Sequence, residues 1–490
     1  MSTTPHEPSA GRLAKGQLGT ADLVFFVVAA AAPLTVVAGV VPLAIRTGGL
    51  SAVYGYLIPG IVLILFAIGF TAMSPLVRNA GAFYSYIAMG LGKPFGVAGS
   101  YIAVISYNAM TICLLSGFAV YAQSTILSLT GLNVPWPILA AVGLAGVVVL
   151  GYFRVTLGAK VLGIALGLEV LVLVIYEIVV VSTGGHSGLD TSMFNPAVTL
   201  DPGFGAMLVL TAGGFIGFEA TALYAEEVRN PEKTIPRATY AAIGFLALFY
   251  TFSVWCVIVA FGGDKALAFA NSDNVAVMTF VSISRYVGTW LADAGQILLV
   301  TSAFAATLAF HNAASRYHFA LAREGILPRA LARISRKHGS PVGGVILQGA
   351  ITFLVLAFAA VVGADPYLVV FLWAAAPGVI GILLLEAVTA VAIVAFFARN
   401  RHGHNIWRVI IAPAAGAIGL FILVWLCLAQ LDLLTAASPT VNVLLMAPIA
   451  VVAIAGAVQA LWLRRARPTV YDELGSTNVE KIELADVDQV

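Results

Sequence analysis

Long apolar stretches alternate with short polar loops along nearly the whole chain. A helix that crosses a membrane needs about 20 predominantly apolar residues. Twelve stretches approach or exceed this length, over residues 21–45, 50–73, 96–129, 136–153, 160–182, 204–224, 239–261, 288–322, 345–362, 369–398, 407–430 and 441–463. The pattern predicts an all-α integral membrane protein with twelve transmembrane helices.

Two of these predicted spans are poor helices. The first contains AAAAPLTVV, in which Pro33 lacks a backbone donor and clashes with the preceding turn. The sixth contains Gly213, Gly214 and Gly217, and each glycine costs about 1 kcal/mol of helix propensity relative to alanine. The sixth span comes five spans after the first. Because five is odd, the two segments run in opposite directions, as an inverted repeat of spans one to five onto six to ten requires.

A helix break at membrane depth is tolerated only inside protein or beside a watery cavity. It frees N–H and C=O groups and half-helix ends that can bind a carboxylate, an ammonium group or a cation. Alternatively, the glycines let neighbouring helices pack closely. The matching weak point in the first span favours the binding interpretation.

Composition and charge agree with a membrane protein. The 490 residues are 60% hydrophobic and 10% charged, whereas soluble domains are about 25% charged. With both termini in the cytoplasm, only Arg46, Lys265 and Arg285 of the 25 Lys and Arg residues lie outside, as the positive-inside rule demands. The basic residues therefore serve as topology signals, and we expect no nucleic-acid partner.

Other features of composition bear on location and cofactors. The three cysteines lie in apolar segments without metal-binding spacing, so we expect no metal and no cofactor. The absence of Asn-x-Ser/Thr sites and the many Ala, Val and Gly residues indicate a bacterial inner membrane. The polar tail after Leu463 is predicted to be a disordered cytoplasmic extension.

The run GGFIGFEATALYAEEVRNPEKTIPRA resembles the sixth span and following loop of the amino acid-polyamine-organocation (APC) permeases. Their pattern is a glycine-rich break, an acid and then a Glu-Glu-x-x-Asn-Pro-x-x-x-x-Pro-Arg loop. The loop pattern is kept at Glu226, Glu227, Asn230, Pro231, Pro236 and Arg237. NAGAFYSYIAMGLGKPFG and HNAASRYHFALAREGILP agree as well, and the resemblance covers residues 20–463.

This resemblance implies the leucine-transporter-type fold, with ten helices in two inverted repeats of five and two further helices at the C-terminus. The expected division is a cytoplasmic N-terminal tail (1–20), the first repeat (21–182), the second repeat (204–398), the two extra helices (407–463) and a cytoplasmic C-terminal tail (464–490). It also implies a substrate site between the broken first and sixth spans, lined by the third, eighth and tenth.

By position, the resemblance assigns one half of the substrate site to each break. The first comprises Ala31, Ala32, Pro33, Leu34 and Thr35, and the second comprises Gly213, Gly214, Phe215, Ile216 and Gly217. AAAAPLTVV departs from the Gly-Ser/Ala-Gly-Ile break that is usual in the family. In the third span, Tyr107 and Asn108 lie where the family contributes to the pocket, although an aromatic side chain inside a helix more often serves packing.

Glu169 is the best-placed titratable group in the spans. It lies about 13 Å into the fifth span, close to the middle of a hydrocarbon core about 30 Å thick. In many proton-coupled relatives a lysine in this region replaces the sodium ion of sodium-coupled relatives. Glu169 is therefore expected to carry a proton, or with Thr301 and Ser302 to ligate sodium, or to be purely structural; we predict proton coupling.

Three further acids lie in apolar segments. Glu219 follows the glycine break by two residues and is predicted to support the unwound region rather than to contact substrate. Glu177 and Glu386 are interpreted as structural or gating residues. Intramembrane acids are costly to bury, so each is a functional hypothesis.

These features predict a secondary active transporter for an amino acid, working by alternating access. The alternatives are a polyamine or other organic-amine permease, an amino acid exchanger, and a transport-inactive membrane receptor or sensor. No HExxH, GxSxG or Walker pattern occurs, so neither an enzyme nor an ATP-driven pump is expected. The expected partners are a neutral or cationic amino acid or amine, protons and membrane lipid.

Overall fold

The computed structural model describes residue 16 and residues 18–77, 81–153, 155–195 and 203–475. Every named element in these ranges is helical, and ten stretches are long and apolar enough to cross a membrane. The chain is therefore a multi-pass membrane protein. One of the ten stretches, Thr20–Leu76, has 57 residues, about 85 Å of α-helix; Gly49, with φ 62°, turns the chain inside it.

The elements follow one another as short pieces near the N-terminus and as long helices afterwards. They are α1 (Thr20–Ala31), α2 (Pro33–Thr35), η1 (Val36–Val40), α3 (Val41–Gly48), η2 (Gly49–Val53), α4 (Tyr54–Met73), α5 (Phe83–Leu91), α6 (Lys93–Thr130), α7 (Trp136–Tyr152), α8 (Val155–Thr183), α9 (Phe204–Ala212), η6 (Gly213–Phe215), η7 (Phe218–Tyr224), α10 (Pro231–Phe261), α11 (Gly263–Ala270), α12 (Met278–Tyr286), α13 (Thr289–Arg323), α14 (Val342–Val361), η10 (Pro366–Phe371), α15 (Leu372–Arg399), η11 (Trp407–Ile411), α16 (Ala412–Ala429), α17 (Leu431–Thr435), α18 (Pro439–Ala466) and α19 (Pro468–Glu473).

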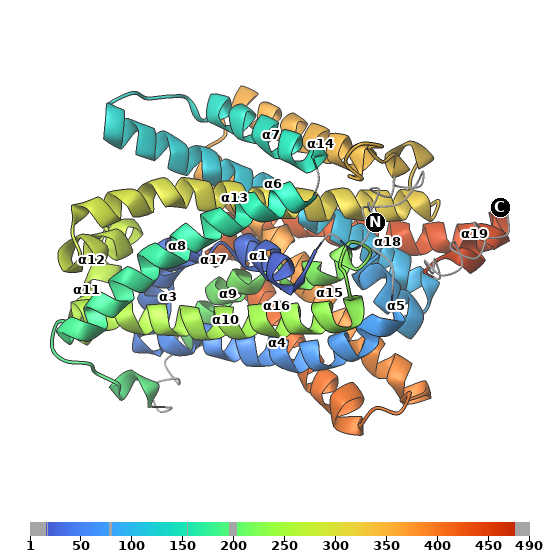
Figure 1. Ribbon diagram of the computed structural model, residues 1–490, viewed down its shortest axis with the longest axis horizontal. Coiled ribbons are helices and arrows are strands. Elements are labelled where there is room, and N and C mark those ends of the chain that lie inside the picture. The colour runs from blue at the N-terminus through green and yellow to red at the C-terminus, as the bar shows by residue number, and fades with distance from the viewer. Residues whose placement is uncertain (1–15, 17, 78–80, 154, 196–202, 476–490) are drawn as a thin grey trace, which may run out of the picture.

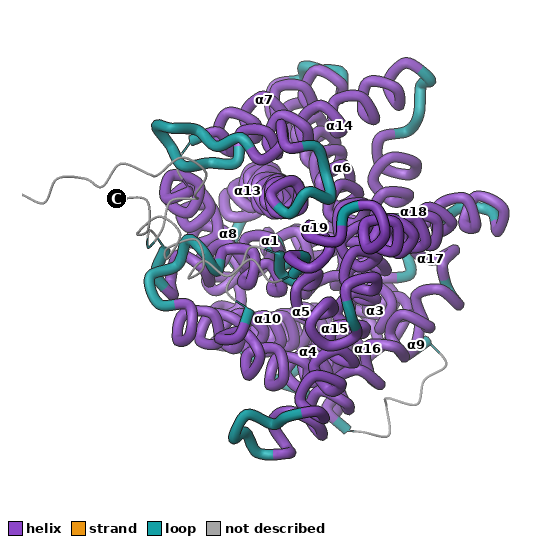
Figure 2. The backbone as a smooth tube through the Cα atoms, turned by 90° about the vertical axis from the view of Figure 1, so that its right-hand side faces the viewer, coloured by secondary structure: helices purple, strands orange, loops and turns teal. Residues whose placement is uncertain are grey.

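The long helices lie alongside one another, with α11 and α12 at one end of the molecule and α5 and α19 at the other (Figure 1). Seen along the bundle, α1 lies in the middle, where it contacts α8, α10 and α13 (Figure 2). Helices α7 and α14 lie together at the periphery in both views. The first span therefore forms the centre of the molecule.

Burial follows this arrangement. Side chains of α1 such as Leu23 and Val27 are almost fully buried. On the outer helices, large apolar side chains are exposed, as Phe358 on α14 and Val443 on α18 illustrate. An apolar exterior of this kind suits hydrocarbon and would be unfavourable in water.

The prediction of a disordered tail after Leu463 is wrong for residues 464–475. Helix α18 continues to Ala466, and α19 follows directly. Lys93 donates a 2.8 Å hydrogen bond to the Asp472 carbonyl and lies 5.0 Å from the ring centre of Tyr471, and Leu474 is buried. Tyr471 and Leu474 stand among charged residues. The average composition of the tail is therefore polar, although these two residues pack against the protein. Residues 476–490 of the predicted tail, and 1–15 and 17 of the N-terminal one, lie outside the described residues.

Candidate functional site

Both predicted helix breaks are confirmed. Helix α1 ends at Ala31, Ala32 adopts the left-handed conformation (φ 49°, ψ 69°), and Pro33 begins α2. In the sixth span α9 ends at Ala212, and Gly217 with φ 120° separates the 3₁₀ turns η6 and η7. A non-glycine residue in the left-handed region is strained and persists only where its surroundings enforce it.

The two broken spans run antiparallel, with their breaks facing each other. A Cβ atom on Gly217 would lie 2.6 Å from the Cβ of Ala30, and one on Gly48 would lie 2.8 Å from the Cβ of Met207. At the start of α1, Leu18 forms a bridge with Val228, just beyond η7. Residue numbers thus rise in one span as they fall in the other, which is the direction predicted from the sequence.

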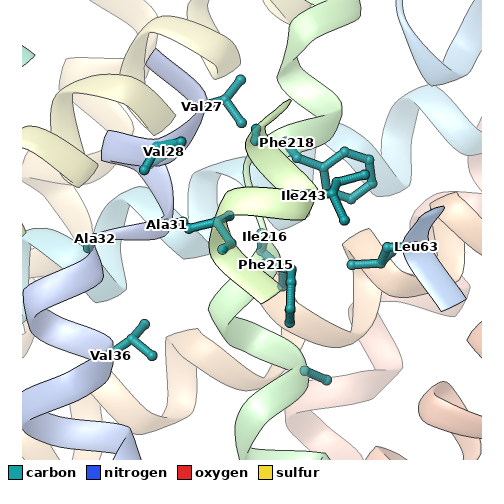
Figure 3. Packing of buried hydrophobic residues seen from close by; sticks show 14 of the residues in the cluster. Val27, Val28, Ala31, Ala32, Val36, Leu63, Phe215, Ile216, Phe218 and Ile243 are labelled. Carbon is teal, nitrogen blue, oxygen red and sulfur yellow. The ribbon is translucent and has the colours of Figure 1, made fainter. Parts of the chain in front are cut away.

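Apolar side chains from both breaks pack together at this meeting point. Figure 3 shows Ala31 of the first span near Ile216 of the sixth, with Ala32 further from the crossing; these residues and Phe215 are all buried. These four side chains offer no hydrogen-bonding group, so among these residues only the main chain is polar. A site here would bind its ligand largely through main-chain N–H and C=O groups.

Buried side chains hold the free ends of the first break. The Tyr250 hydroxyl donates to the Ala31 carbonyl over 3.2 Å, and the Leu34 main chain hydrogen-bonds the Glu169 carboxylate. The carbonyl end of α1 is thus paired with Tyr250, and an amide of α2 is paired with the carboxyl group of Glu169. Free groups at helix ends need such partners.

Glu169 joins three spans. Its side chain on α8 is 2% exposed and accepts a 2.7 Å hydrogen bond from Ser302 on α13. Ser302 in turn accepts one from the Thr35 hydroxyl over 3.2 Å. The predicted coupling residues Glu169 and Ser302 therefore meet, together with Thr35 of the first half-site.

Thr301 does not join this cluster. Its side chain is exposed, and its hydroxyl donates to the Leu298 carbonyl of its own helix over 2.9 Å. Consecutive helical residues point about 100° apart, so Ser302 and Thr301 cannot both face Glu169. Their order along the sequence did not reveal which of the two faces inward.

Glu219 holds the second break. Its Oε2 accepts a 2.7 Å hydrogen bond from the Gly217 N–H, and its Oε1 accepts a 2.8 Å hydrogen bond from the Tyr107 hydroxyl on α6. Asn108 turns away and donates its Nδ2 to the Val104 carbonyl over 2.8 Å. The geometry fits the predicted supporting role of Glu219. Tyr107 contacts the second break through Glu219, whereas Asn108 bonds only its own helix.

A small cavity lies next to the second break. Of the predicted substrate-binding residues, Gly217 and Tyr107 line it. Its walls come from α1, α6, η7 and α13, and none of the lining residues is charged. They are Phe26, Ala30, Tyr107, Gly217, Ala220, Tyr224, Ala309, Phe310 and Ala313.

The sequence interpretation missed a buried ion pair beside this cavity. Arg316 on α13 donates to both carboxylate oxygens of Glu227, over 2.6 and 3.1 Å, and the two side chains are 4% and 2% exposed. The guanidinium group lies 4.3 Å from the ring centre of Tyr224. The acid is visible in the polar run EEVRNP and the arginine in HNAASRY, but the sequence does not show that they pair.

Comparison with known proteins gives the family. The amino acid permease family model matches residues 22–470. The branched-chain amino acid permease BcaP of Lactococcus lactis is 24% identical over 333 residues, 64% of this chain and 70% of the relative. An uncharacterized transporter of Mycobacterium tuberculosis is 27% identical over 358 residues, covering 71% and 75%, and the aromatic amino acid transport protein AroP of Escherichia coli is 24% identical over 319 residues, covering 63% and 67%. Because the family model matches most of this chain, the chain belongs to the amino acid permease family of the APC superfamily.

Proposed function

We propose that this permease is a secondary active transporter that moves an amino acid across the bacterial plasma membrane by alternating access. The observation that carries the proposal is the meeting of two antiparallel broken helices at the centre of the bundle. Breaks of this kind supply main-chain groups and half-helix ends to a ligand near the membrane midplane.

The proposal includes the layout expected from the sequence. Thr20–Leu76 counts as two spans and α7 as a further one, which gives twelve. Residues 21–182 and 204–398 form the inverted repeats, residues 407–463 form the two extra helices, and both tails are cytoplasmic. The end of the molecule that carries α5 and α19 then faces the cytoplasm (Figure 1), and the apolar exterior faces lipid.

The substrate is proposed to bind at Ala31–Thr35 and Gly213–Gly217, with its carboxylate and ammonium groups on the main chain. The residues around Gly217 are apolar apart from Tyr107; once the small cavity between them widens, these surroundings favour a neutral amino acid with an apolar side chain. The names of the branched-chain and aromatic relatives point to the same class. A polyamine has at least two cationic groups, and the lining offers no acid to them.

The test is uptake of radiolabelled amino acids and polyamines into proteoliposomes, with a proton gradient, with a sodium gradient and with neither. We expect accumulation of a branched-chain or aromatic amino acid that follows the proton gradient. Rapid counterflow without gradient dependence would identify an exchanger. Movement of polyamines alone would replace the proposed substrate, and no movement of any compound would favour a receptor.

Coupling to protons is proposed to act through Glu169. Its carboxylate contacts the first break through Leu34 and, through Ser302, Thr35, so a change in its charge alters the groups that hold the break. Hydrogen-bond donors from Ser302 and Leu34 already point at the carboxylate, which disfavours sodium there.

In Glu169→Gln, the side chain can still accept the Ser302 hydrogen bond but cannot exchange a proton. We expect proton-driven accumulation to fall sharply, while substrate binding and counterflow stay within about twofold, less than 0.5 kcal/mol. Transport and binding assays on the same proteoliposomes measure both.

The matched control is Glu177→Gln, because Glu177 lies on the same helix and is paired with Ser253, away from both breaks. It is expected to keep gradient-driven accumulation. Unchanged coupling in Glu169→Gln would rule out this role for Glu169.

A further inference from the structure

Glu386 on α15 is a buried acid to which the proposed transport cycle assigns no role. Its side chain is 1% exposed, and neither carboxylate oxygen has a hydrogen-bond partner among the residues that the structure describes. A charged carboxylate in such a place is strongly disfavoured, because nothing replaces the water that it loses. The group must therefore be neutral in this conformation or have a cation beside it.

The face of α15 that carries Glu386 is turned towards the second break. Val379 precedes Glu386 by seven residues, almost two helical turns, so the two side chains point in nearly the same direction. A Cβ atom on Gly213 would lie 3.5 Å from Cγ2 of Val379. Glu386 accordingly lies further along the same contact, where the sixth span continues into η7.

Glu219 is the acid that η7 brings near Glu386, and the two carboxyl groups interact electrostatically. They differ in what surrounds them. Glu219 accepts hydrogen bonds from Gly217 and Tyr107, which stabilise a negative charge, whereas Glu386 accepts none. When two acids share a buried region, the one without donors keeps the proton.

No basic side chain of the described residues neutralises Glu386. Tyr107 of α6 and Glu219 of η7 are the groups that interact with it electrostatically. Helices α4, α5 and α16 contact α15 and have no charged residue; their titratable side chains are Tyr54, Tyr56, Tyr84, Tyr86 and Cys427, which are uncharged at neutral pH. Charged residues on the other elements packed against α15 lie near element ends: Lys93 on α6, Arg408 on η11, Asp432 on α17, and Arg464 and Arg465 on α18.

We propose that Glu386 is a second proton-binding site, separate from Glu169, which holds a proton while α15 is packed against α6 beside the second break and releases it when this contact opens to water. The ligand is the proton alone. The release step breaks the O–H bond of the Glu386 carboxylic acid and passes the proton to water. The inference goes beyond the proposed function, which places coupling at Glu169.

Infrared difference spectroscopy of the purified protein in lipid tests the bound proton without any substrate. Wild type is expected to show the carbonyl band of protonated carboxyl groups at neutral pH. Glu386→Gln is expected to lose one component of this band, while any component from Glu169, which is also proposed to carry a proton, remains. Glutamine has the shape of the neutral acid and should leave the fold intact; Glu386→Met, similar in volume, serves as a second variant. Glu232→Gln, an exposed acid on α10, should keep the band.

The number of protons moved per amino acid, from reversal potentials in proteoliposomes, tests release. Glu386→Gln is expected to move one proton fewer than wild type, whereas Glu232→Gln should match wild type. A band in Glu386→Gln that is unchanged from wild type, or an unchanged proton number, overturns the proposal. If wild type transports no amino acid, the proposed function fails while the infrared result still tests Glu386.

Discussion

Gly217→Ala is expected to lower uptake at least tenfold and to destabilise the protein by about 2–4 kcal/mol. Gly217 has φ 120°, a conformation in which a side chain is strained. The new Cβ would also lie 2.6 Å from the Cβ of Ala30, which belongs to a helix and cannot rotate away. Both effects push the two breaks apart and disturb the hydrogen bond from Gly217 to Glu219. Uptake per folded transporter and thermal unfolding in detergent measure the two losses.

Gly244→Ala is the matched control, because Gly244 lies inside α10 and a Cβ there would meet no atom within 4 Å. It should behave as wild type or be slightly more stable, since alanine favours the helix. Adding Ala30→Gly to Gly217→Ala removes the clash but leaves the backbone strain, so it should restore part of the stability. Wild-type uptake in Gly217→Ala would mean that the break tolerates an ordinary backbone and does not need close contact with α1.

Glu227→Gln is expected to destabilise the protein by about 3–5 kcal/mol, the usual cost of removing one partner from a buried ion pair. Arg316 would keep its charge and lose its anion: the glutamine Oε1 could accept one hydrogen bond, the new NH2 group would oppose the guanidinium, and the Asn312 carbonyl and the Tyr224 ring would remain beside it. The contact between α13 and the loop after η7 should loosen with it. Thermal unfolding, together with protease sensitivity of the 225–230 loop, measures the effect.

A double-mutant cycle separates two costs: the loss of the ion pair itself, and the burial of an Arg316 charge that has lost its partner. Arg316→Met removes the charge and keeps most of the side-chain length, so Glu227→Gln combined with Arg316→Met should be more stable than Glu227→Gln alone. Arg229, which is exposed, provides a surface control: Arg229→Met should change stability by less than about 1 kcal/mol. Equal stability of Glu227→Gln and wild type would contradict a structural role for the pair.

The sequence predicts the breaks well because their cause is local. Pro33 removes a backbone donor, and Gly213, Gly214 and Gly217 weaken the helix wherever they are placed. Pro33 also disfavours the ordinary helical conformation of Ala32, the residue before it, but this restriction alone does not select the left-handed conformation that Ala32 adopts. The position of each break was therefore predictable, and the geometry of the first one was not.

The site is less predictable than the fold because each side-chain contact depends on the rotation of a helix about its axis. Glu169 and Ser302 meet while Thr301 points outward, and no apolar periodicity distinguishes the two neighbours. Tyr250 and Arg316 escaped notice for the same reason. The depth of a residue in the membrane can be predicted by counting residues along its own helix. Its contacts depend on the other helices and cannot be predicted in this way.

The first and sixth spans are joined by main-chain hydrogen bonds as well as by packing. The Leu18 N–H donates to the Glu227 carbonyl over 3.1 Å, and the Arg229 N–H donates to the Leu18 carbonyl over 3.0 Å. These directional bonds fix the two segments against each other just before α1 and just after η7. Motion that exposes the centre of the bundle is then expected where the first and sixth spans meet α6, α13 and α15. Side chains hold these surfaces together, and side chains can exchange neighbours.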